Sequence, residues 1–261
     1  MIGVFDSGLG GLTVVKEILR QLPGRGIVYF GDTARTPYGP KGPEIVRRFA
    51  VEDARFLMSH GADAIIVACN TVSALAIDAV REAVDVPVFE VVSPAVERAA
   101  AVTKGKVGVI GTRGTVGSGV YAKKMAEQAP SARVYAQACP LFVPIVEEGW
   151  LRRPEAASIA KTYLRQLRLR HIDTLILGCT HYPFLRAQIA AAIGPGVRLV
   201  DPARETVAAF SRYLDGQPAL AKKLARSKKH RFFASDATPH AERIASEWLG
   251  RDIILEKAHL E

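Results

Sequence analysis

The sequence predicts an α/β fold of two pseudo-symmetric, parallel-sheet domains that face each other across a central cleft. Two observations predict it. Short apolar runs rich in β-branched residues alternate with longer amphipathic runs, which is the pattern of strands covered on both faces by helices. In addition, similar motifs recur at a near-constant spacing along the chain of 261 residues, which indicates two related units.

The short apolar runs are the strand candidates, because their length fits a strand better than a helix. They cover residues 2–5, 27–30, 64–67, 88–91, 107–110, 133–135, 174–177, 197–200 and 231–234. The amphipathic runs between them predict helices over residues 13–21, 43–60, 71–83, 94–103, 154–170 and 183–192, with a last helix near 241–249. Strands separated by helices are typically parallel, since each helix carries the chain back to the start of the next strand.

Three pairs of motifs define the repeat. IGVFDSG recurs as VGVIGTRG, GADAIIVACNT as HIDTLILGCTH, and VFEVVSPA as VRLVDPA, in the same order. Their offsets are 105 (107 − 2), 110 (179 − 69) and 108 (202 − 94). We therefore expect a first domain of residues 1–94 plus 205–261, in which the C-terminal tail completes the first unit, and a second domain of residues 95–204.

Composition argues against several classes of protein. No run approaches the roughly 20 apolar residues needed to span a bilayer. The N-terminus has no basic region ahead of its apolar stretch, so we expect a cytoplasmic protein without a signal peptide. Part of the net charge of +9 lies in residues 222–231, but no recognisable nucleic-acid motif accompanies it. We therefore expect neither a membrane nor a nucleic-acid partner.

Three cysteines, Cys69, Cys139 and Cys179, lie far apart in the sequence, which fits neither a disulfide framework nor the spacing of a metal site. A lone cysteine is usually a small buried hydrophobe. Cys69 and Cys179, however, end matching strands of the repeat, and ligands bind just outside the carboxyl ends of parallel strands. We therefore expect these two thiols on opposite walls of the cleft, which makes the cleft the candidate active site.

Two facing thiols can invert a carbon centre. One thiolate removes a proton from one face of the carbon, and the other group, as a thiol, returns a proton to the opposite face. Both cysteines are expected to precede helices, whose N-termini lower the pKa of a thiol. A single nucleophilic Cys179 assisted by His181 is an alternative, although it leaves Cys69 without a role. A redox pair would need a C-x-x-C motif, which the sequence lacks.

Five blocks together resemble the signature motifs of the glutamate racemase family: FDSGLGGLTV, GDTARTPYG, VACNTVSA, CPLFVPIVEEG and LGCTHYPFL. They occur in that family's order between residues 5 and 185. The resemblance implies interconversion of L- and D-glutamate without a cofactor, which supplies D-glutamate for bacterial peptidoglycan. Such a site must stabilise the developing negative charge with fixed N–H and O–H donors.

The resemblance also implies roles for particular residues. Cys69 acts as the base toward D-glutamate with help from Asp6, and Cys179 acts toward L-glutamate with help from His181 and Glu147. The implied substrate contacts are Asp6, Ser7, Tyr38, Gly39, Asn70, Thr71, Thr180 and His181. Thr112 joins them, because it is the repeat partner of Ser7 in a glycine-rich turn that can cradle a carboxylate. Cys139 matches no base of the family and is expected to pack in the core.

Two other functions stay open from the sequence. One is racemisation of another small substrate, such as aspartate or a hydantoin, and the other is ligand capture by a two-lobed binding protein without catalysis. We also expect the domains to close over the substrate, because excluding water strengthens every electrostatic contact in the site. The sequence leaves the oligomeric state open, with a homodimer as one option.

Overall fold

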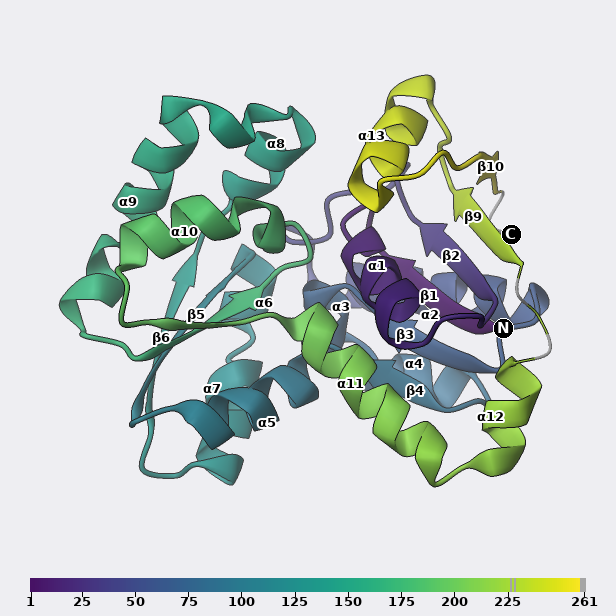
Figure 1. The fold of residues 1–261 in the computed structure, drawn as a ribbon, viewed down its shortest axis with the longest axis horizontal. Helices are drawn as coiled ribbons and strands as arrows, with labels where there is room; N and C mark the ends of the chain where they lie inside the picture. Colours follow the sequence, from purple (N-terminus) through teal and green to yellow (C-terminus); the bar gives the residue numbers. More distant parts are fainter. Residues whose placement is uncertain (226, 228, 259–261) are drawn as a thin grey trace.

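Two separate parallel sheets form the framework of the molecule, and the predicted fold class is confirmed (Figure 1). The computed structural model describes residues 1–225, 227 and 229–258; the predicted basic segment 222–231 therefore includes two residues, Arg226 and Lys228, that lie outside the described part. The first sheet has the strand order β10-β9-β2-β1-β3-β4, and the second has the order β6-β5-β7-β8.

The strand bounds are β1 (Ile2–Asp6), β2 (Ile27–Gly31), β3 (Ala64–Val67), β4 (Val88–Glu90), β5 (Lys106–Gly111), β6 (Arg133–Ala138), β7 (Thr174–Gly178), β8 (Arg198–Val200), β9 (His230–Ala234) and β10 (Leu255–Lys257). Every residue of β1, β2, β3 and β7 is buried, as their continuous apolar sequence predicts. Burying a Val, Ile or Phe side chain stabilises the folded state by about 1.5–3 kcal/mol relative to leaving it exposed. The central strands are therefore the most strongly anchored parts of the fold.

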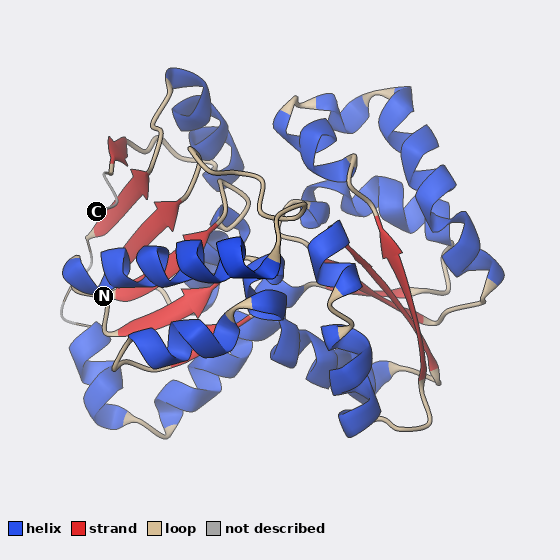
Figure 2. Ribbon diagram, turned by 180° about the vertical axis from the view of Figure 1, so that it is seen from behind, coloured by secondary structure: helices blue, strands red, loops and turns tan. Residues whose placement is uncertain are grey.

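The helix bounds are α1 (Leu12–Gln21), α2 (Pro43–Ser59), α3 (Asn70–Leu75), α4 (Ile77–Ala83), α5 (Val92–Val102), α6 (Arg113–Gly117), α7 (Val120–Gln128), α8 (Phe142–Glu147), η1 (Trp150–Arg152), α9 (Pro154–Leu169), η2 (Tyr182–Leu185), α10 (Arg186–Ile193), α11 (Pro202–Asp215), α12 (Pro218–Leu224) and α13 (Pro239–Leu249). Helices lie on both faces of each sheet (Figure 2). Several begin with proline, whose fixed φ suits the first helical turn and whose missing N–H is not needed there.

The two sheets repeat one topology. The order β2-β1-β3-β4 in the first sheet corresponds to β6-β5-β7-β8 in the second. Ile2 pairs with Ala64 in the first sheet, and Val107 pairs with Thr174 in the second. These pairs differ by 105 (107 − 2) and 110 (174 − 64), the same offsets that the motifs have. The carboxyl ends of β3 and β7 are therefore structurally equivalent.

Some predicted elements differ from the structure. The helix predicted over residues 71–83 is two helices, α3 and α4, separated at Ala76, whose φ of −141° and ψ of 6° are not helical. The helix predicted over residues 183–192 starts as the 3₁₀ turn η2 and continues as α10. Strand β10 was not predicted, because its sequence LEK carries a single apolar residue.

The chain crosses between the sheets in two helices. α5 connects β4 of the first sheet to β5 of the second, and α11 leads from β8 back toward β9 and β10 at the edge of the first sheet (Figure 1). The two helices pack against each other. Among the residues that the structure describes, no helix is both long and apolar enough to cross a membrane.

Candidate active site

Cys69 and Cys179 lie at equivalent carboxyl ends of the two sheets. Cys69 comes five residues after Ala64 of β3 (69 − 64), and Cys179 five residues after Thr174 of β7 (179 − 174). Both thiols are free and almost completely buried, with 5% and 7% exposure. They border one cavity of about 30 Å³ between the domains.

The same cavity brings together most of the residues that the sequence singled out. Besides the two cysteines, its lining includes Ser7, Tyr38, Gly39, Asn70, Thr71, Thr112, Thr180 and His181. Asp6 and Glu147 lie one layer further out, because Asp6 contacts Thr180 and Glu147 contacts His181. The candidate residues from both halves of the chain thus form one site.

Cys69 is held as a neutral thiol. Burial raises its pKa to about 12, and the charge of Asp6 adds to the shift, although a backbone N–H from Val72 and the hydroxyl of Ser7 oppose it. The Cys69 Sγ lies 3.6 Å from the Ser7 Oγ. Cys69 does precede a helix, and the N–H of Val72 in α3 lowers its pKa as expected, but desolvation outweighs this contribution.

Asp6 is also buried, with 1% exposure. Burial raises its pKa, while the nearby His181 and the backbone N–H groups of Gly11 and Gly8 oppose the shift. Its carboxylate accepts a hydrogen bond of 3.2 Å from the N–H of Gly8 and one of 3.5 Å from the hydroxyl of Thr180 in the second domain. Asp6 therefore connects the surroundings of Cys69 to the strand end that carries Cys179.

Cys179 belongs to a chain of three polar groups. Its Sγ lies 3.9 Å from Nδ1 of His181, and Nε2 of His181 lies 3.0 Å from a carboxylate oxygen of Glu147 at the end of α8. Burial alone lowers the pKa of His181, but the Cys179 sulfur and the Glu147 carboxylate together raise it to about 10. The chain Glu147–His181–Cys179 thus places a positively charged imidazole beside the second sulfur. After Cys179 the chain enters the turn η2 and not an α-helix.

Hydrogen bonds join the two domains around the cavity. The hydroxyl of Thr71 lies 3.0 Å from that of Thr112 and 3.4 Å from that of Thr115. Tyr121 of α7 donates a hydrogen bond of 2.7 Å to Oδ1 of Asn70. Because Oδ1 accepts this bond, the NH₂ group of Asn70 is left as a donor for a ligand.

Sequence reasoning missed three of the neighbours of the site. Thr115 and Tyr121 hold predicted site residues across the domain boundary, and the Trp248 ring of α13 lies edge-on to the His181 ring at 5.5 Å. Tyr121 and Trp248 stand in no motif that marks chemistry, and Thr115 lies in the same glycine-rich turn as Thr112 but was not singled out. The signal for Thr115 was its place three residues after Thr112, where the Thr112 hydroxyl caps α6 by accepting the N–H of Thr115.

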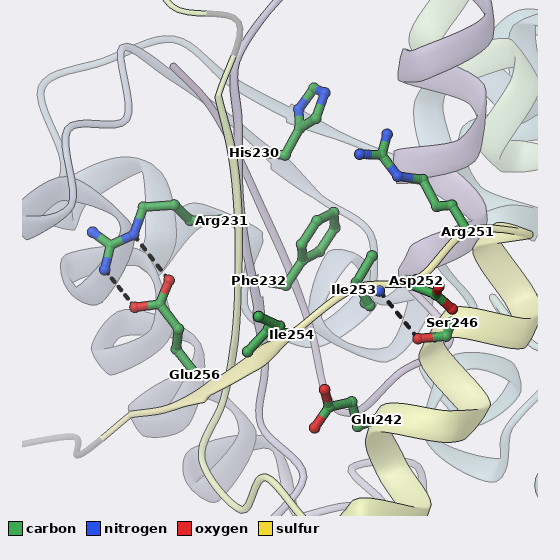
Figure 3. Close-up of a pocket in the computed structure, with 10 residues that line it drawn as sticks. All are labelled: His230, Arg231, Phe232, Glu242, Ser246, Arg251, Asp252, Ile253, Ile254 and Glu256. Atoms are coloured by element: carbon green, nitrogen blue, oxygen red, sulfur yellow. Dashed lines mark hydrogen bonds and ion pairs between the residues drawn. The ribbon is translucent and has the colours of Figure 1, made fainter.

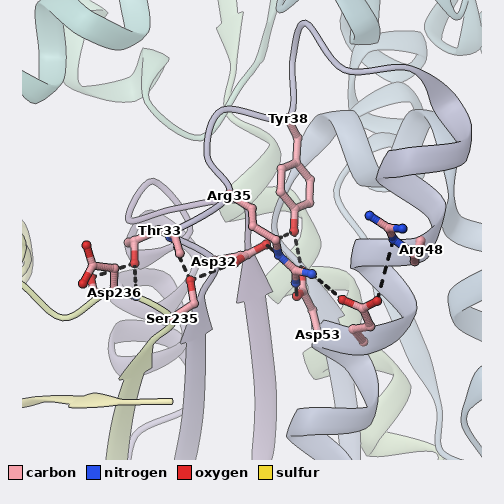
Figure 4. A network of polar contacts seen from close by, with 10 residues as sticks. Asp32, Thr33, Arg35, Tyr38, Arg48, Asp53, Ser235 and Asp236 are labelled. Carbon is pink, nitrogen blue, oxygen red and sulfur yellow. Dashed lines mark hydrogen bonds and ion pairs between the residues drawn. The ribbon is translucent and has the colours of Figure 1, made fainter. Parts of the chain in front are cut away.

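Tyr38 lines the cavity without offering its hydroxyl to it. The hydroxyl donates to Asp32 and also lies 3.0 Å from Asp53 of α2, and the whole side chain is buried (Figure 4). The predicted substrate contact at Tyr38 is thus limited to its main chain and ring. Next to it, the carbonyl of Gly39 accepts a 2.9 Å hydrogen bond from the N–H of Gly114 in the second domain.

Two further cavities differ in their relation to this site. One of about 320 Å³ shares Thr36, Pro37, Gly39, Thr112 and Val143 with the cysteine cavity and is thus its vestibule. The other, of about 930 Å³, is formed by β9, α13 and the segment before β10, at the outer edge of the first sheet (Figure 3). Within the described residues, no group of three or more His, Cys, Asp or Glu side chains is arranged to hold a metal ion.

Comparisons with known proteins agree with this geometry. The sequence model of the Asp/Glu/hydantoin racemase family matches residues 2–210. A glutamate racemase from Geobacter metallireducens is 47% identical over 250 residues, which cover 95% of this chain and 92% of the relative. The crystal structure of a glutamate racemase from Bacillus anthracis matches with a TM-score of 0.94 at 41% identity, over 100% of this chain and 97% of that one. A glutamate racemase from Francisella tularensis, solved in complex with D-glutamate, matches with a TM-score of 0.92 at 38% identity, again over 100% and 97%.

Proposed function

The chain belongs to the Asp/Glu/hydantoin racemase family, and we propose that it interconverts L- and D-glutamate with Cys69 and Cys179 as its two bases. Glutamate racemases that match this chain over nearly its full length support the proposal. One observation of the structure carries the proposal: both sulfurs border one cavity, at equivalent ends of repeated strands. Inversion at a single carbon needs a proton acceptor on one face and a donor on the other.

The reaction proceeds in two proton transfers. The thiolate of one cysteine removes the α-hydrogen of glutamate as a proton, which leaves a carbanion, and the thiol of the other cysteine protonates the opposite face. L-glutamate is deprotonated by Cys179 and reprotonated by Cys69, and D-glutamate meets the reverse arrangement. One proton leaves the substrate and one enters the product, so each turnover is balanced.

The neighbours of each sulfur suit these roles. The raised pKa keeps Cys69 protonated, as the conversion of L-glutamate requires. The imidazole of His181, held by Glu147, stabilises a thiolate at Cys179. For the conversion of D-glutamate, the proton of Cys69 must leave first, and the buried Asp6 carboxylate beside it is the group that takes this proton.

Side-chain donors bind the substrate and stabilise the carbanion. The hydroxyls of Ser7, Thr71, Thr112 and Thr180 and the amide of Asn70 line the cavity. No cofactor is invoked, so the negative charge that develops on the α-carboxylate must be met by these fixed donors in a site that excludes water.

The site opens to admit its substrate. A cavity of about 30 Å³ has room for about one water molecule and not for an amino acid. Because the walls belong to different domains, separating them enlarges the cavity toward the vestibule that shares five of its residues. Closure then brings the two sulfurs to the same α-carbon.

In the cell, the reaction supplies D-glutamate for peptidoglycan in the cytoplasm. This part of the proposal rests on the likeness of the chain to glutamate racemases.

The function is tested with purified protein in D₂O. We expect L-glutamate, without any added cofactor, to give D-glutamate that carries deuterium at the α-carbon, measured by chiral chromatography and mass spectrometry. The Cys69→Ser/Cys179→Ser double variant is the control. Failure of the wild-type protein to form the D-isomer would contradict the proposal.

A second assay decides the substrate within the family. The description of the family also covers aspartate and hydantoin racemases. Turnover of L-glutamate and L-aspartate is compared by circular dichroism at equal concentrations, and we expect glutamate to be strongly preferred. Equal or faster turnover of aspartate would change the assigned substrate but not the two-thiol chemistry.

A further inference from the structure

A buried polar cluster holds the side chain of Tyr38 in the loop of residues 36–39. It consists of Asp32, Arg35, Tyr38 and Asp53, and we call it the Tyr38 cluster (Figure 4). Asp32, Tyr38 and Asp53 have 0% exposure, and the Arg35 side chain has 22%. The guanidinium of Arg35 stacks over the Phe49 ring at 4.0 Å. The two buried carboxyl groups thus share the guanidinium of Arg35 with the less buried Glu52, and the Tyr38 phenol lies between the two buried carboxyl groups.

Asp32 is the acceptor in each of its side-chain hydrogen bonds. One of its oxygens accepts from Nε of Arg35 at 2.6 Å and from the Tyr38 hydroxyl. The other accepts from the hydroxyl of Ser235 at 2.8 Å, and Ser235 in turn accepts the N–H of Ala34. Every side-chain hydrogen bond of Asp32 therefore uses it as an acceptor.

The two carboxyl oxygens of Asp53 have different partners. Its Oδ1 accepts from Arg35 at 3.0 Å, whereas its Oδ2 lies 3.0 Å from the Tyr38 hydroxyl. That hydroxyl has one hydrogen, which it already donates to Asp32. A hydrogen bond between Tyr38 and Asp53 then needs a proton on Oδ2 of Asp53. Burial raises the pKa of Asp53, and the charges of Asp32 and Glu52 raise it further, whereas Arg35 and the Tyr38 hydroxyl oppose the shift.

We infer that Asp32, Arg35 and Asp53 are positioning residues for the substrate-lining loop 36–39, and that Asp53 performs this role as a neutral acid that donates to Tyr38. The relay runs from Asp53 to the Tyr38 oxygen and from the Tyr38 hydrogen to Asp32. The inference rests on the proposed function only in that this loop lines the proposed substrate site.

The relay reaches the active site through the loop. Tyr38 is fixed at its hydroxyl, and the next residue, Gly39, makes the backbone hydrogen bond to Gly114 that joins the two domains. Gly39 also packs closely on Thr112, since a Cβ at this position would lie 2.8 Å from the Thr112 Cβ. A loosened Tyr38 therefore shifts both a wall of the cavity and a contact between the domains.

Because Asp53 donates to Tyr38 whereas Asp32 only accepts, we expect the same Asp→Asn replacement to have different effects at the two positions. In Asp53→Asn, the amide oxygen still accepts from Arg35 and the NH₂ group still donates to the Tyr38 oxygen, so the relay survives. In Asp32→Asn, one of the two acceptor oxygens becomes a donor and faces either Ser235 or the pair of donors from Arg35 and Tyr38. Tyr38→Phe removes the link altogether.

The first measurement needs no enzymatic activity. Amide hydrogen exchange of the segment that contains Gly114 is measured by mass spectrometry in the full-length protein. We expect exchange within about twofold of wild type in Asp53→Asn and about tenfold faster exchange in Asp32→Asn and Tyr38→Phe, which is the change that follows from losing one hydrogen bond to a charged group. Should Asp32→Asn fail to fold, Tyr38→Phe supplies the same comparison.

The second measurement separates positioning from a general loss of structure. We expect KM for glutamate to rise about tenfold in Asp32→Asn and Tyr38→Phe with a smaller change in kcat, and both constants to stay near wild type in Asp53→Asn. Equal damage from the two Asp→Asn changes would overturn the neutral Asp53, and unchanged exchange and KM in Tyr38→Phe would overturn the positioning role. If wild-type protein does not racemise glutamate, the proposed function fails while the exchange comparison still decides the cluster.

Discussion

At the scale of single residues, the two cysteines are equivalent in position but not in surroundings. The repeat partner of His181 is Thr71 (181 − 71 = 110), and the partner of Asp6 is Gly111 (111 − 6 = 105). One sulfur therefore has a carboxyl group as its ionisable neighbour, and the other has an imidazole. The fold supplies the symmetry that two-sided chemistry needs, and individual side chains break it.

Single replacements of the cysteines should separate the two proton transfers. We expect Cys69→Ser and Cys179→Ser each to lower kcat/KM for racemisation about 10³-fold or more, because a serine hydroxyl is a far weaker acid than a thiol. The loss in kcat/KM must be the same for both enantiomers in any variant, since L- and D-glutamate have equal free energies in water.

The different roles of the two cysteines toward L- and D-glutamate can be measured only in a reaction that needs one base. Elimination of chloride from 3-chloroglutamate requires α-proton removal from one face alone. We expect Cys69→Ser to keep elimination from the L-configured analogue and Cys179→Ser to keep it from the D-configured one. If each variant lost elimination from both analogues equally, the assignment of the two bases to opposite faces would be wrong.

The protonation of His181 predicts a pH dependence of stability. Its pKa rises from 6.5 to about 10 on folding, so the native state binds more protons than the unfolded state between these values. The contribution of His181 to the free energy of unfolding is therefore complete below pH 6.5 and is lost as the pH rises toward 10. One pKa unit corresponds to about 1.4 kcal/mol, which makes the loss a few kcal/mol.

The difference between wild type and His181→Asn isolates this contribution from other groups that titrate. Urea unfolding of both proteins at pH 6, 8 and 10 gives the free-energy difference at each pH. We expect the advantage of the wild-type protein to shrink steadily over this range. An advantage that stays constant or grows would show that His181 is not held protonated by Cys179 and Glu147.

At the scale of elements, the loop between β1 and α1 fits closely against the second domain. A Cβ at Gly10 would lie 2.2 Å from the Thr180 hydroxyl and 2.6 Å from the His181 ring. We expect Gly10→Ala to lower kcat/KM by about 10²-fold, because pushing the walls apart by about an ångström misplaces the reacting groups. Gly42→Ala is the matched control, since a Cβ there meets no atom within 4 Å. Thermal unfolding of both variants checks that the fold is kept, and equal activity of the two would argue against the close fit.

Sequence reasoning reached the strands more reliably than the helices of this fold. The central strands β1, β3 and β7 contain continuous apolar runs, and those runs end where the strands end, to within one residue. The break at Ala76 gave no signal, because alanine favours the helix and the two halves share one amphipathic pattern. The motifs found the residues that line the cavity, but the direction of the Tyr38 hydroxyl depends on Asp53 of α2, a contact that no local pattern encodes.

At the scale of the whole molecule, the active site exists only where the two domains meet. Each sheet contributes one sulfur, and the helices α5 and α11, which carry the chain across, pack against each other. The repeat in the sequence predicted two facing units. It could not predict how closely they approach, because that is set by hydrogen bonds between side chains far apart in the sequence, such as Thr71 with Thr112 and Tyr121 with Asn70.

A shared cavity predicts shared protection of its two thiols. Cys69 and Cys179 border the same space, so one bound glutamate should shield both from a small alkylating reagent. We expect saturating D-glutamate to slow the modification of both by iodoacetamide to a similar extent, about tenfold or more. This follows because alkylation requires the open state, and the ligand favours the closed state in proportion to its occupancy. Cys139, with 0% exposure and outside the lining of this cavity, is the internal control. Modification is followed for each cysteine by peptide mass spectrometry, and protection of only one of the two sulfurs would mean that they do not address the same substrate.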